Sequence, residues 1–265
     1  MHTLNPEQMT GLHLFYHPLS NCAGRVLLAI EEKGLKVEKH LIDLLKSKQL
    51  TEEYIAINPK GEVPAIVHDG MAMHESVTIL RYLEETFPEV SLSPKEDSLR
   101  EQMNDWLDAA GRSHEPGVVN YVYAKGYGRL PTPRDWVFYQ AHIPHRTRFH
   151  EERRKGLIGC DLKQAEAVLH DQFSKLEQAL QDREYLVGNT YSLADIAWFP
   201  NAFVLQVLGY SLQPFPNVKR WMKRIESRPA FKNGYRKELP PVPMSLLGVI
   251  ARAVTKIVRK TGDRF

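Results

Sequence analysis

The chain has 265 residues, of which 43% are hydrophobic, so it can bury a core as one large domain or two small ones. Its 35 basic and 32 acidic residues leave a formal charge of +3. That surplus is too small to indicate nucleic acid as a partner, because phosphate binding needs a concentrated basic field. Two cysteines, Cys22 and Cys160, give no disulfide framework and are typical of a reducing compartment.

The sequence shows no pattern for export or membrane insertion. The first ten residues are polar and lack the apolar stretch of a secretory signal. No apolar run approaches the roughly 18 residues that a membrane-spanning helix needs. These features predict a soluble, cytoplasmic protein.

The first third of the chain alternates strands with helices. Apolar and polar residues alternate over 11–17, which predicts a strand. A helix is expected over 25–33, because Gly34 stands where a C-terminal glycine belongs. Strand-like alternation returns over 36–43, and a polar, weakly periodic stretch follows over 44–57.

Two short apolar runs then meet at a turn. The runs 64–68 and 71–74 are joined by an Asp-Gly pair, the strongest short-range signal for a β-hairpin. Ser76 opens a helix that ends before Pro88. The order of elements in this part is β-α-β-α-β-β-α.

The remainder of the chain has a different character. Nearly all of 98–232 consists of helix and connection, and 161–181 carries its apolar residues on one face. Mixed elements followed by helices alone predict two domains of unlike class. We expect an α/β domain over 11–88 and an all-helical domain over 96–240.

Three short motifs stand out in the α/β domain. The first spans 20–26 (SNCAGRV), the second spans 58–64 (NPKGEVP), and the third is the pair Glu75-Ser76. Their order and spacing resemble the glutathione transferase superfamily, over most of the chain. The resemblance implies a thioredoxin-like domain followed by an all-α domain, glutathione as co-substrate, no metal, and a homodimer.

The first motif is similar to the activating loop of serine-type transferases, particularly the zeta class. A free thiol has a pKa of about 8.5, so little of it is thiolate at neutral pH. A hydroxyl at a helix N-terminus favours the anion through a hydrogen bond and the helix dipole. The resemblance therefore implies that Ser20 activates glutathione. The alternative for Ser20 is a simple capping role.

Cys22 in the same loop supports a second interpretation. In omega-like relatives a cysteine in this loop forms a mixed disulfide with glutathione, which gives thiol transfer or reduction. No Cys-x-x-Cys pair is present, because Arg25 occupies the second position. Cys22 is also interpretable as an inert core residue. We place Ser20 ahead of Cys22 as the catalytic group.

The other two motifs are expected to hold glutathione. In the family the Val-Pro bond is cis, a geometry nearly confined to proline, and the backbone before the proline pairs with the cysteinyl unit of glutathione. The resemblance therefore implies that Val63 and Pro64 bind glutathione. A helix N-terminus offers N–H groups to the γ-glutamyl carboxylate of glutathione, which implies that Ser76 binds this carboxylate. Glu75 is expected to pair with the γ-glutamyl ammonium group. Gln49 matches a polar position near the glycyl end, with plain surface exposure as its alternative.

The acceptor pocket is expected in the helical domain. Segment 142–156 is longer and more basic than in compact relatives, and it is similar to an insert in bacterial β-aryl etherases and reductive dehalogenases. This favours a bulky aromatic electrophile, attacked at carbon by the thiolate. The histidines of the segment form no metal-ligand pattern. Five aromatic residues are predicted to form an apolar wall, with core packing as the alternative for each: Trp106, Tyr121, Tyr123, Trp198 and Phe203.

Two further features complete the chain. Ser192 and Asp195 have the spacing of a helix capping box, which we interpret as structural. The segment 243–265 is a basic amphipathic extension. We expect it to pack over the substrate pocket or a neighbouring subunit; contact with an anionic membrane surface is the alternative.

The sequence thus predicts a glutathione transferase that attacks a hydrophobic electrophile, by conjugation or by displacement of an ether or halide. Two alternatives remain. One is a glutathione-dependent thiol transferase or reductase that uses Cys22, and the other is a transferase-like binding module without catalysis.

Overall fold

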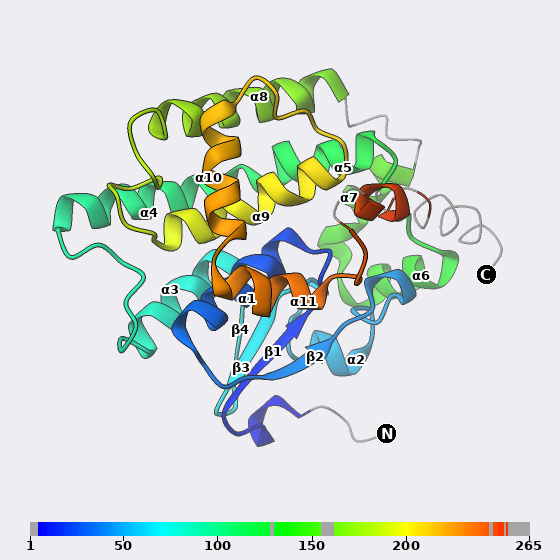
Figure 1. Cartoon of the computed structure of the whole chain (residues 1–265). Coiled ribbons are helices and arrows are strands. Elements are labelled where there is room, and N and C mark those ends of the chain that lie inside the picture. The colour runs from blue at the N-terminus through cyan, green and yellow to red at the C-terminus, as the bar shows by residue number, and fades with distance from the viewer. Residues whose placement is uncertain (1–4, 128–129, 155–161, 244–245, 252, 254–265) are drawn as a thin grey trace.

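The computed structural model describes residues 5–127, 130–154, 162–243, 246–251 and 253. A four-stranded sheet and its helices form one end of the molecule, and a helical layer forms the other (Figure 1). The strands follow the order β2-β1-β3-β4, with β2 parallel to β1 and the other pairs antiparallel. Their bounds are β1 Leu12–Tyr16, β2 Glu38–Leu41, β3 Ala65–His68 and β4 Met71–His74.

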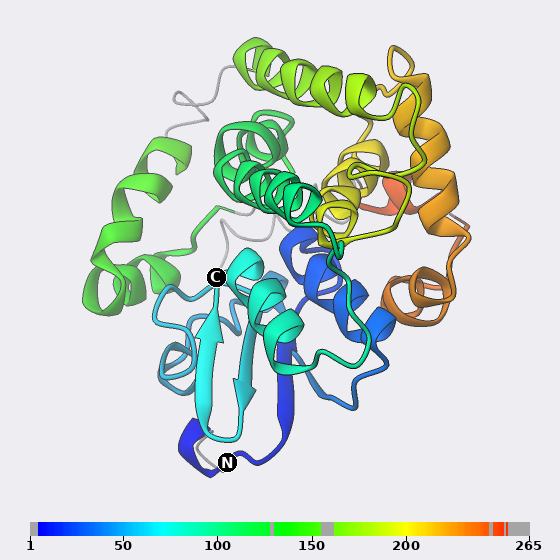
Figure 2. The same ribbon diagram turned by 90° about the vertical axis from the view of Figure 1, so that its left-hand side faces the viewer.

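Helices cover both faces of the sheet. Leu12 and Leu14 point to the face covered by α1 (Asn21–Lys33) and α3 (Ser76–Thr86), whereas Phe15 points to the face covered by α2 (Glu52–Ile55). Figure 2 shows α1 and α3 lying between the sheet and the helical layer. The predicted thioredoxin-like order is confirmed. Three short 3-10 turns lie at Pro6–Gln8, Leu44–Lys46 and Pro144–Arg146.

Helix α1 begins earlier than its hydrophobic pattern predicts. Ser20 is the N-cap, and its Oγ accepts a hydrogen bond from the backbone N–H of Ala23 at 3.2 Å. The first turn includes Gly24 because the ring of Tyr235 lies against it; a Cβ there would come within 2.8 Å of Tyr235 Cζ. The predicted glycine end is confirmed, since Gly34 has φ of 64°.

The hairpin is built by the turn that its sequence indicates. Asp69 and Gly70 have φ of 46° and 85°, and two positive φ values are what a type I′ hairpin turn requires. The turn sets the register of β3 against β4, with Ala65 opposite His74. The end of β4 therefore delivers Glu75 directly to the start of α3.

In the described residues of the second part of the chain, every regular element is a helix. Its central helix is α9, which is buried along almost its whole length. The predicted capping box of Ser192 and Asp195 is present at its start. The elements are α4 Asp97–Arg112, a π-helical turn His114–Val119, α5 Asn120–Ala124, α6 Pro133–His142, α7 Thr147–Arg154, α8 Leu162–Ala179, α9 Leu193–Val207, α10 Pro216–Glu226, a π-helical turn Phe231–Tyr235 and α11 Arg236–Glu238.

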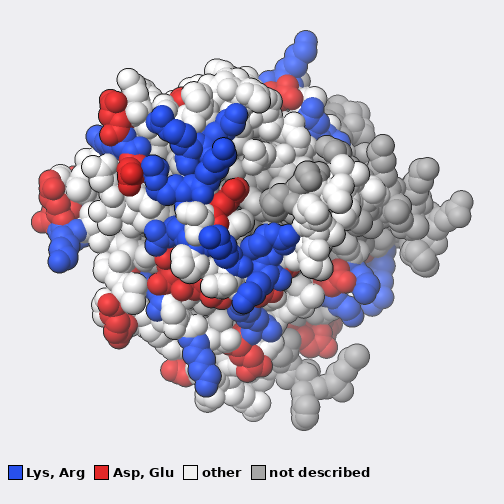
Figure 3. Space-filling model, viewed as in Figure 1, with Lys and Arg blue, Asp and Glu red and all other residues white. Residues whose placement is uncertain are grey.

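The two parts share one hydrophobic core. Side chains of α1 and α9 belong to the same buried cluster. At its margin, Arg228 donates to both carboxylate oxygens of Glu32 at 2.6 and 2.8 Å. Basic side chains gather over α10 and α11 with acidic ones beside them (Figure 3). No helix in the described ranges is long and apolar enough to span a bilayer.

The described start of the C-terminal extension is a helix over 246–251. Leu247 is buried, and Gly248 packs so closely on α9 that any side chain there would overlap the carbonyl oxygen of Val207. This part of the extension therefore packs on the helical domain. The residues 254–265, which carry most of the predicted amphipathic pattern, lie outside the described residues.

Candidate active site

A cavity of about 870 Å³ opens between the α/β domain and the helical domain. All seven residues predicted for catalysis or glutathione binding line it, although they come from four separate segments of the chain. These residues are Ser20, Cys22, Gln49, Val63, Pro64, Glu75 and Ser76.

Ser20 presents its hydroxyl to this cavity. Besides capping α1, its Oγ lies 3.5 Å from the carbonyl oxygen of Val63, the outer limit of a hydrogen bond. Its proton is therefore weakly held and can be given to a stronger acceptor. The N-terminus of α1 adds a partial positive charge that favours an anion beside the hydroxyl.

The loop before β3 forms the neighbouring wall. The bond between Val63 and Pro64 is cis. Tyr54 and Asn58 hold the loop from behind, since the Tyr54 hydroxyl and the Asn58 side-chain amide both donate to the carbonyl of Glu62, at 2.6 and 2.7 Å. The backbone of Val63 is thereby fixed at the cavity surface.

Glu75 is held in an unusual backbone conformation at the start of α3. Its φ is 70°, a left-handed value that costs energy for a residue with a side chain and recurs at ligand-binding sites. The Glu75 carboxylate accepts from Lys60 Nζ at 2.5 Å. Burial raises the pKa of Glu75, but Lys60 outweighs this and the net shift is downward. A carboxylate and an ammonium thus face the same end of the cavity.

Gln49 is a buried residue of the same cavity lining. Its Oε1 has no hydrogen-bond partner among the described residues. A buried amide without a partner is costly, and native proteins seldom keep one. The amide therefore fits a polar group of a bound molecule.

Cys22 faces a histidine from the helical domain. Its Sγ lies 3.5 Å from Nε2 of His114. Burial raises the pKa of the Cys22 thiol. His114, Arg25 and a hydrogen bond from Ser76 lower this pKa by more, so the net change is from 9.0 to about 7. The Cys22 thiol is therefore more acidic than an ordinary cysteine thiol.

A chain of hydrogen bonds sets the proton on His114. Arg25 Nη2 donates to Asn201 Oδ1 at 3.1 Å, which identifies that atom as the oxygen. Asn21 Nδ2 donates to the same oxygen at 2.7 Å and lies 3.2 Å from His114 Nδ1. Nδ1 must therefore accept, so Nε2 carries the proton and donates to the sulfur of Cys22.

Arg25 is the buried cation behind this wall. It donates to Ser76 Oγ at 3.0 Å and to the backbone carbonyls of Ala197 and Ala110 at 2.8 and 3.1 Å, besides Asn201. All four acceptors are neutral. Because none of these acceptors neutralises Arg25, its positive charge stabilises an anion at Cys22 or next to Ser76.

The five aromatic candidates divide into two groups. Tyr123 and Phe203 line the cavity. Trp106, Tyr121 and Trp198 do not, and their assignment to the pocket is corrected: Trp198 Nε1 donates to the backbone carbonyl of Trp106, and Tyr121 meets Tyr210 edge to face. The apolar lining comes instead from Val118, Val122, Phe149, Val204, Val207 and Leu247.

The basic segment 142–156, described as far as residue 154, contributes to the same cavity. His145, Arg146, Phe149 and His150 line it. The guanidinium of Arg146 stacks 4.0 Å from the ring centre of Phe149 and pairs with Glu62 at 2.7 Å. This segment therefore forms part of the cavity wall and contacts α5, since the rings of Phe149 and Tyr123 meet edge to face with centres 5.8 Å apart.

Comparisons with known proteins identify the family of this chain. The family models described as glutathione S-transferase N-terminal domain and C-terminal domain match residues 14–91 and 160–229. Protein LigF of Sphingobium sp. is 31% identical over 226 residues, which cover 80% of this chain and 88% of the relative. The chain belongs to the glutathione S-transferase family. The resemblance of the three motifs to this family is confirmed, and the chain belongs to a family of enzymes.

Other relatives of this transferase point the same way. Glutathione S-transferase hmp2 of Hypomyces subiculosus is 31% identical over 210 residues, covering 77% of this chain and 89% of the relative. Maleylacetoacetate isomerase of Mus musculus is 26% identical, with coverage of 88% and 96%. The crystal structure of the β-etherase LigF matches with a TM-score of 0.72 at 28% identity, covering 85% of this chain and 99% of LigF.

Sequence reasoning missed two residues that line this cavity, His114 and Lys60. His114 lies 92 positions after Cys22, and nothing in its local sequence indicates the contact. Lys60 lies within the second motif, where its sequence position indicates no role. Arg25 belongs to the first motif but has no predicted role there, although an arginine leading an apolar helix indicates a buried charge that must be hydrogen-bonded.

Proposed function

We propose that this transferase activates the thiol of glutathione at Ser20 and directs it at a hydrophobic, aromatic electrophile. The observation that carries the proposal is the convergence of Ser20, the cis Val63-Pro64 loop and the start of α3 on one cavity wall. These groups present a hydroxyl, an open backbone edge and a helix N-terminus. Together they match the thiol, the cysteinyl amide and the γ-glutamyl carboxylate of the tripeptide.

Glutathione would lie with its γ-glutamyl end at Glu75 and Ser76. Its ammonium would share Glu75 with Lys60, and its carboxylate would meet Ser76, which Arg25 supports from behind at 3.0 Å. Its glycyl unit would lie at Gln49, where the glycyl N–H can donate to the unpaired Oε1. This direction brings the sulfur to Ser20 and the mouth of the apolar half of the cavity.

The reaction we propose is nucleophilic displacement at carbon. The thiolate forms a carbon–sulfur bond while the bond to the leaving group breaks, and a phenolate or halide departs with the electron pair. The proton lost by glutathione balances the anion that leaves. The related β-etherase LigF supports an ether as the substrate, and the aromatic lining by Tyr123, Phe149 and Phe203 supports an aryl group on that ether.

Steady-state kinetics with glutathione and an aryl ether or aryl halide test this proposal. Removing a hydrogen bond to a charged group costs about 1.5–3 kcal/mol, so Ser20→Ala should lower kcat/KM by about 10- to 100-fold. Cys22→Ala, two residues away, is the matched control and should keep most of the activity. Full activity in Ser20→Ala would reject Ser20 as the activating group.

Thiol transfer at Cys22 is the second candidate function. The lowered pKa of Cys22, about 7, and the N–H of His114 aimed at its sulfur favour it. The Cys22 thiolate would attack a glutathione mixed disulfide, form its own disulfide with glutathione and release the substrate thiolate. A second glutathione thiolate would then free Cys22 and leave glutathione disulfide.

Mass spectrometry separates the two functions. After incubation with glutathione disulfide, Cys22 should carry one glutathione if it is the nucleophile, and disulfide reduction should vanish in Cys22→Ala but persist in Ser20→Ala. If turnover with every substrate is lost only in Cys22→Ala, thiol transfer becomes the main function. If no adduct forms, displacement at Ser20 stands alone.

We also propose that the transferase is a homodimer, as its family resemblance implies. Sedimentation equilibrium of the full chain measures this directly. A mass of twice the 30.5 kDa chain is expected, and a monomer at micromolar concentration would contradict it.

A further inference from the structure

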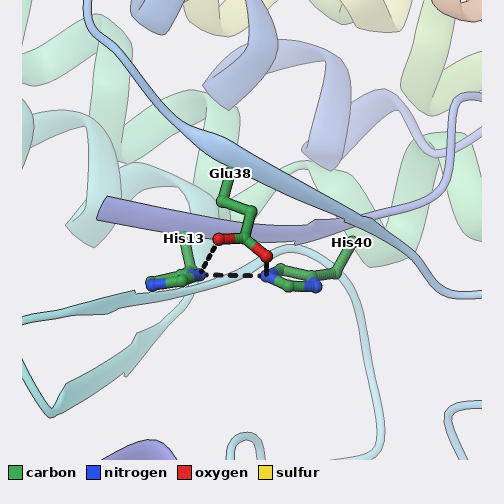
Figure 4. Close-up of side chains that lie close together, drawn as sticks. All are labelled: His13, Glu38 and His40. Atoms are coloured by element: carbon green, nitrogen blue, oxygen red, sulfur yellow. Dashed lines mark hydrogen bonds and ion pairs between the residues drawn. The ribbon is translucent and has the colours of Figure 1, made fainter. Parts of the chain in front are cut away.

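Three side chains of types that can bind metals meet at the edge of the sheet (Figure 4), and none of them lines the cavity. His13 lies near the start of β1, whereas Ser20 follows its end. Glu38 and His40 lie on the edge strand β2, with Glu38 directly opposite His13. Because strand partners and residues two apart share a face, all three side chains project from the same side of the sheet.

The proton positions prepare His13 to bind a cation. Its Nε2 lies 3.0 Å from the backbone carbonyl oxygen of Thr10. A carbonyl can only accept, so Nε2 carries the proton and Nδ1 presents a lone pair. Histidines that bind metals almost always donate their other ring N–H to a carbonyl or carboxylate in this way.

The distances suit ligands that share one ion. Nδ1 of His13 and Nε2 of His40 are 3.0 Å apart. Two nitrogens that each lie about 2.0–2.1 Å from a metal at angles of roughly 90–110° are about 3.0–3.4 Å apart. The Glu38 carboxylate lies 3.7 Å from His13 Nδ1 and 3.6 Å from His40 Nε2, so a small rotation brings an oxygen to the same point.

The surroundings hold the two rings and leave one side open. His13 is buried, and His40 stacks on Phe15 with ring centres 4.5 Å apart. Glu38 is 68% exposed, so water can complete the coordination.

We propose that His13, Glu38 and His40 form a binding site for a divalent transition-metal ion such as Zn²⁺. Two imidazoles and one carboxylate with an open position suit this class of ion. The ion would join the edge strand β2 to β1. Without it, His40 Nε2–H donates to His13 Nδ1. The site is separate from the glutathione cavity, so this proposal does not depend on the proposed transferase reaction.

Isothermal titration of the metal-free full chain with Zn²⁺ tests the proposal. One equivalent should bind at micromolar Zn²⁺ and raise Tm. His40→Gln and the exposed variant Glu38→Gln should each weaken binding by at least about 10- to 100-fold, the loss typical even of groups that support a ligand. His142→Gln, which alters an exposed histidine of α6, is the matched control and should leave the affinity unchanged.

Cobalt spectroscopy separates this site from the Cys22–His114 pair. Co²⁺ at the proposed site should show ligand-field bands without thiolate-to-metal charge transfer, and the spectrum should persist in Cys22→Ala. The proposal is overturned if no equivalent binds, if Glu38→Gln and His40→Gln bind as tightly as wild type, or if binding disappears in Cys22→Ala.

Discussion

Ser20 and Cys22 stand two positions apart at the start of α1, but their side chains meet different surroundings. Ser20 caps the helix and keeps its hydroxyl at the cavity surface. Cys22 turns its sulfur to His114. The motif spacing predicts that both residues lie in the site. It cannot predict how they differ, because the histidine that distinguishes them comes from the helical domain.

The lowered pKa of Cys22 predicts a reactive thiol. Alkylation by iodoacetamide requires the thiolate, so its rate should rise with pH, reach half its maximum near the pKa of about 7 and level off above. His114→Gln removes the N–H donor and should shift this midpoint to higher pH. The measurement belongs in a Cys160→Ser background, where one thiol remains. If the midpoint in the Cys160→Ser protein with His114 intact lies near the pKa of free cysteine, the assignment is contradicted.

Short-range chemistry explains which elements the sequence predicts well. The Asp-Gly turn, Gly34 and the Ser192–Asp195 capping box act within a few residues, and all three have the predicted structure. The aromatic wall was predicted less well. Helical spacing reveals which residues are buried, but it does not distinguish core from pocket, so Trp106 and Trp198 pack against each other instead.

The helix over 246–251 is expected to close the acceptor pocket. Leu247 is 2% exposed and lines the cavity, whereas its neighbour Leu246 is 49% exposed. Leu247→Ser should raise KM for a hydrophobic acceptor by about tenfold, equivalent to about 1.4 kcal/mol, with KM for glutathione unchanged. Leu246→Ser is the matched control. Equal kinetics in both variants would show that this helix does not form part of the pocket.

At the scale of the whole molecule, the site exists only because two domains meet. Gly24 gives room to Tyr235, and Arg25 joins α1 to carbonyls of α4 and α9. The family resemblance predicts a two-domain fold and the glutathione side of the cavity. The contacts across the interface depend on packing between residues far apart in sequence, which local patterns do not encode.

The ion pair between Arg228 and Glu32 is expected to stabilise this interface. Both oxygens of the largely buried Glu32 accept from Arg228, and hydrogen bonds to charged groups contribute about 1.5–3 kcal/mol. Urea unfolding should therefore show Glu32→Gln less stable by about that amount. Asp171→Asn breaks an exposed pair with Lys175 and should change stability by less than about 1 kcal/mol. Similar losses in the two variants would refute a special role for the interface pair.

The ionisation of bound glutathione tests the central claim most directly. A pH titration of thiolate absorbance in the complex gives the pKa of the glutathione thiol. We predict a pKa well below that of free glutathione in the parent protein and in Cys22→Ala, and a return toward the free value in Ser20→Ala. An unchanged pKa in Ser20→Ala, or a return to the free value only in Cys22→Ala, would contradict the account.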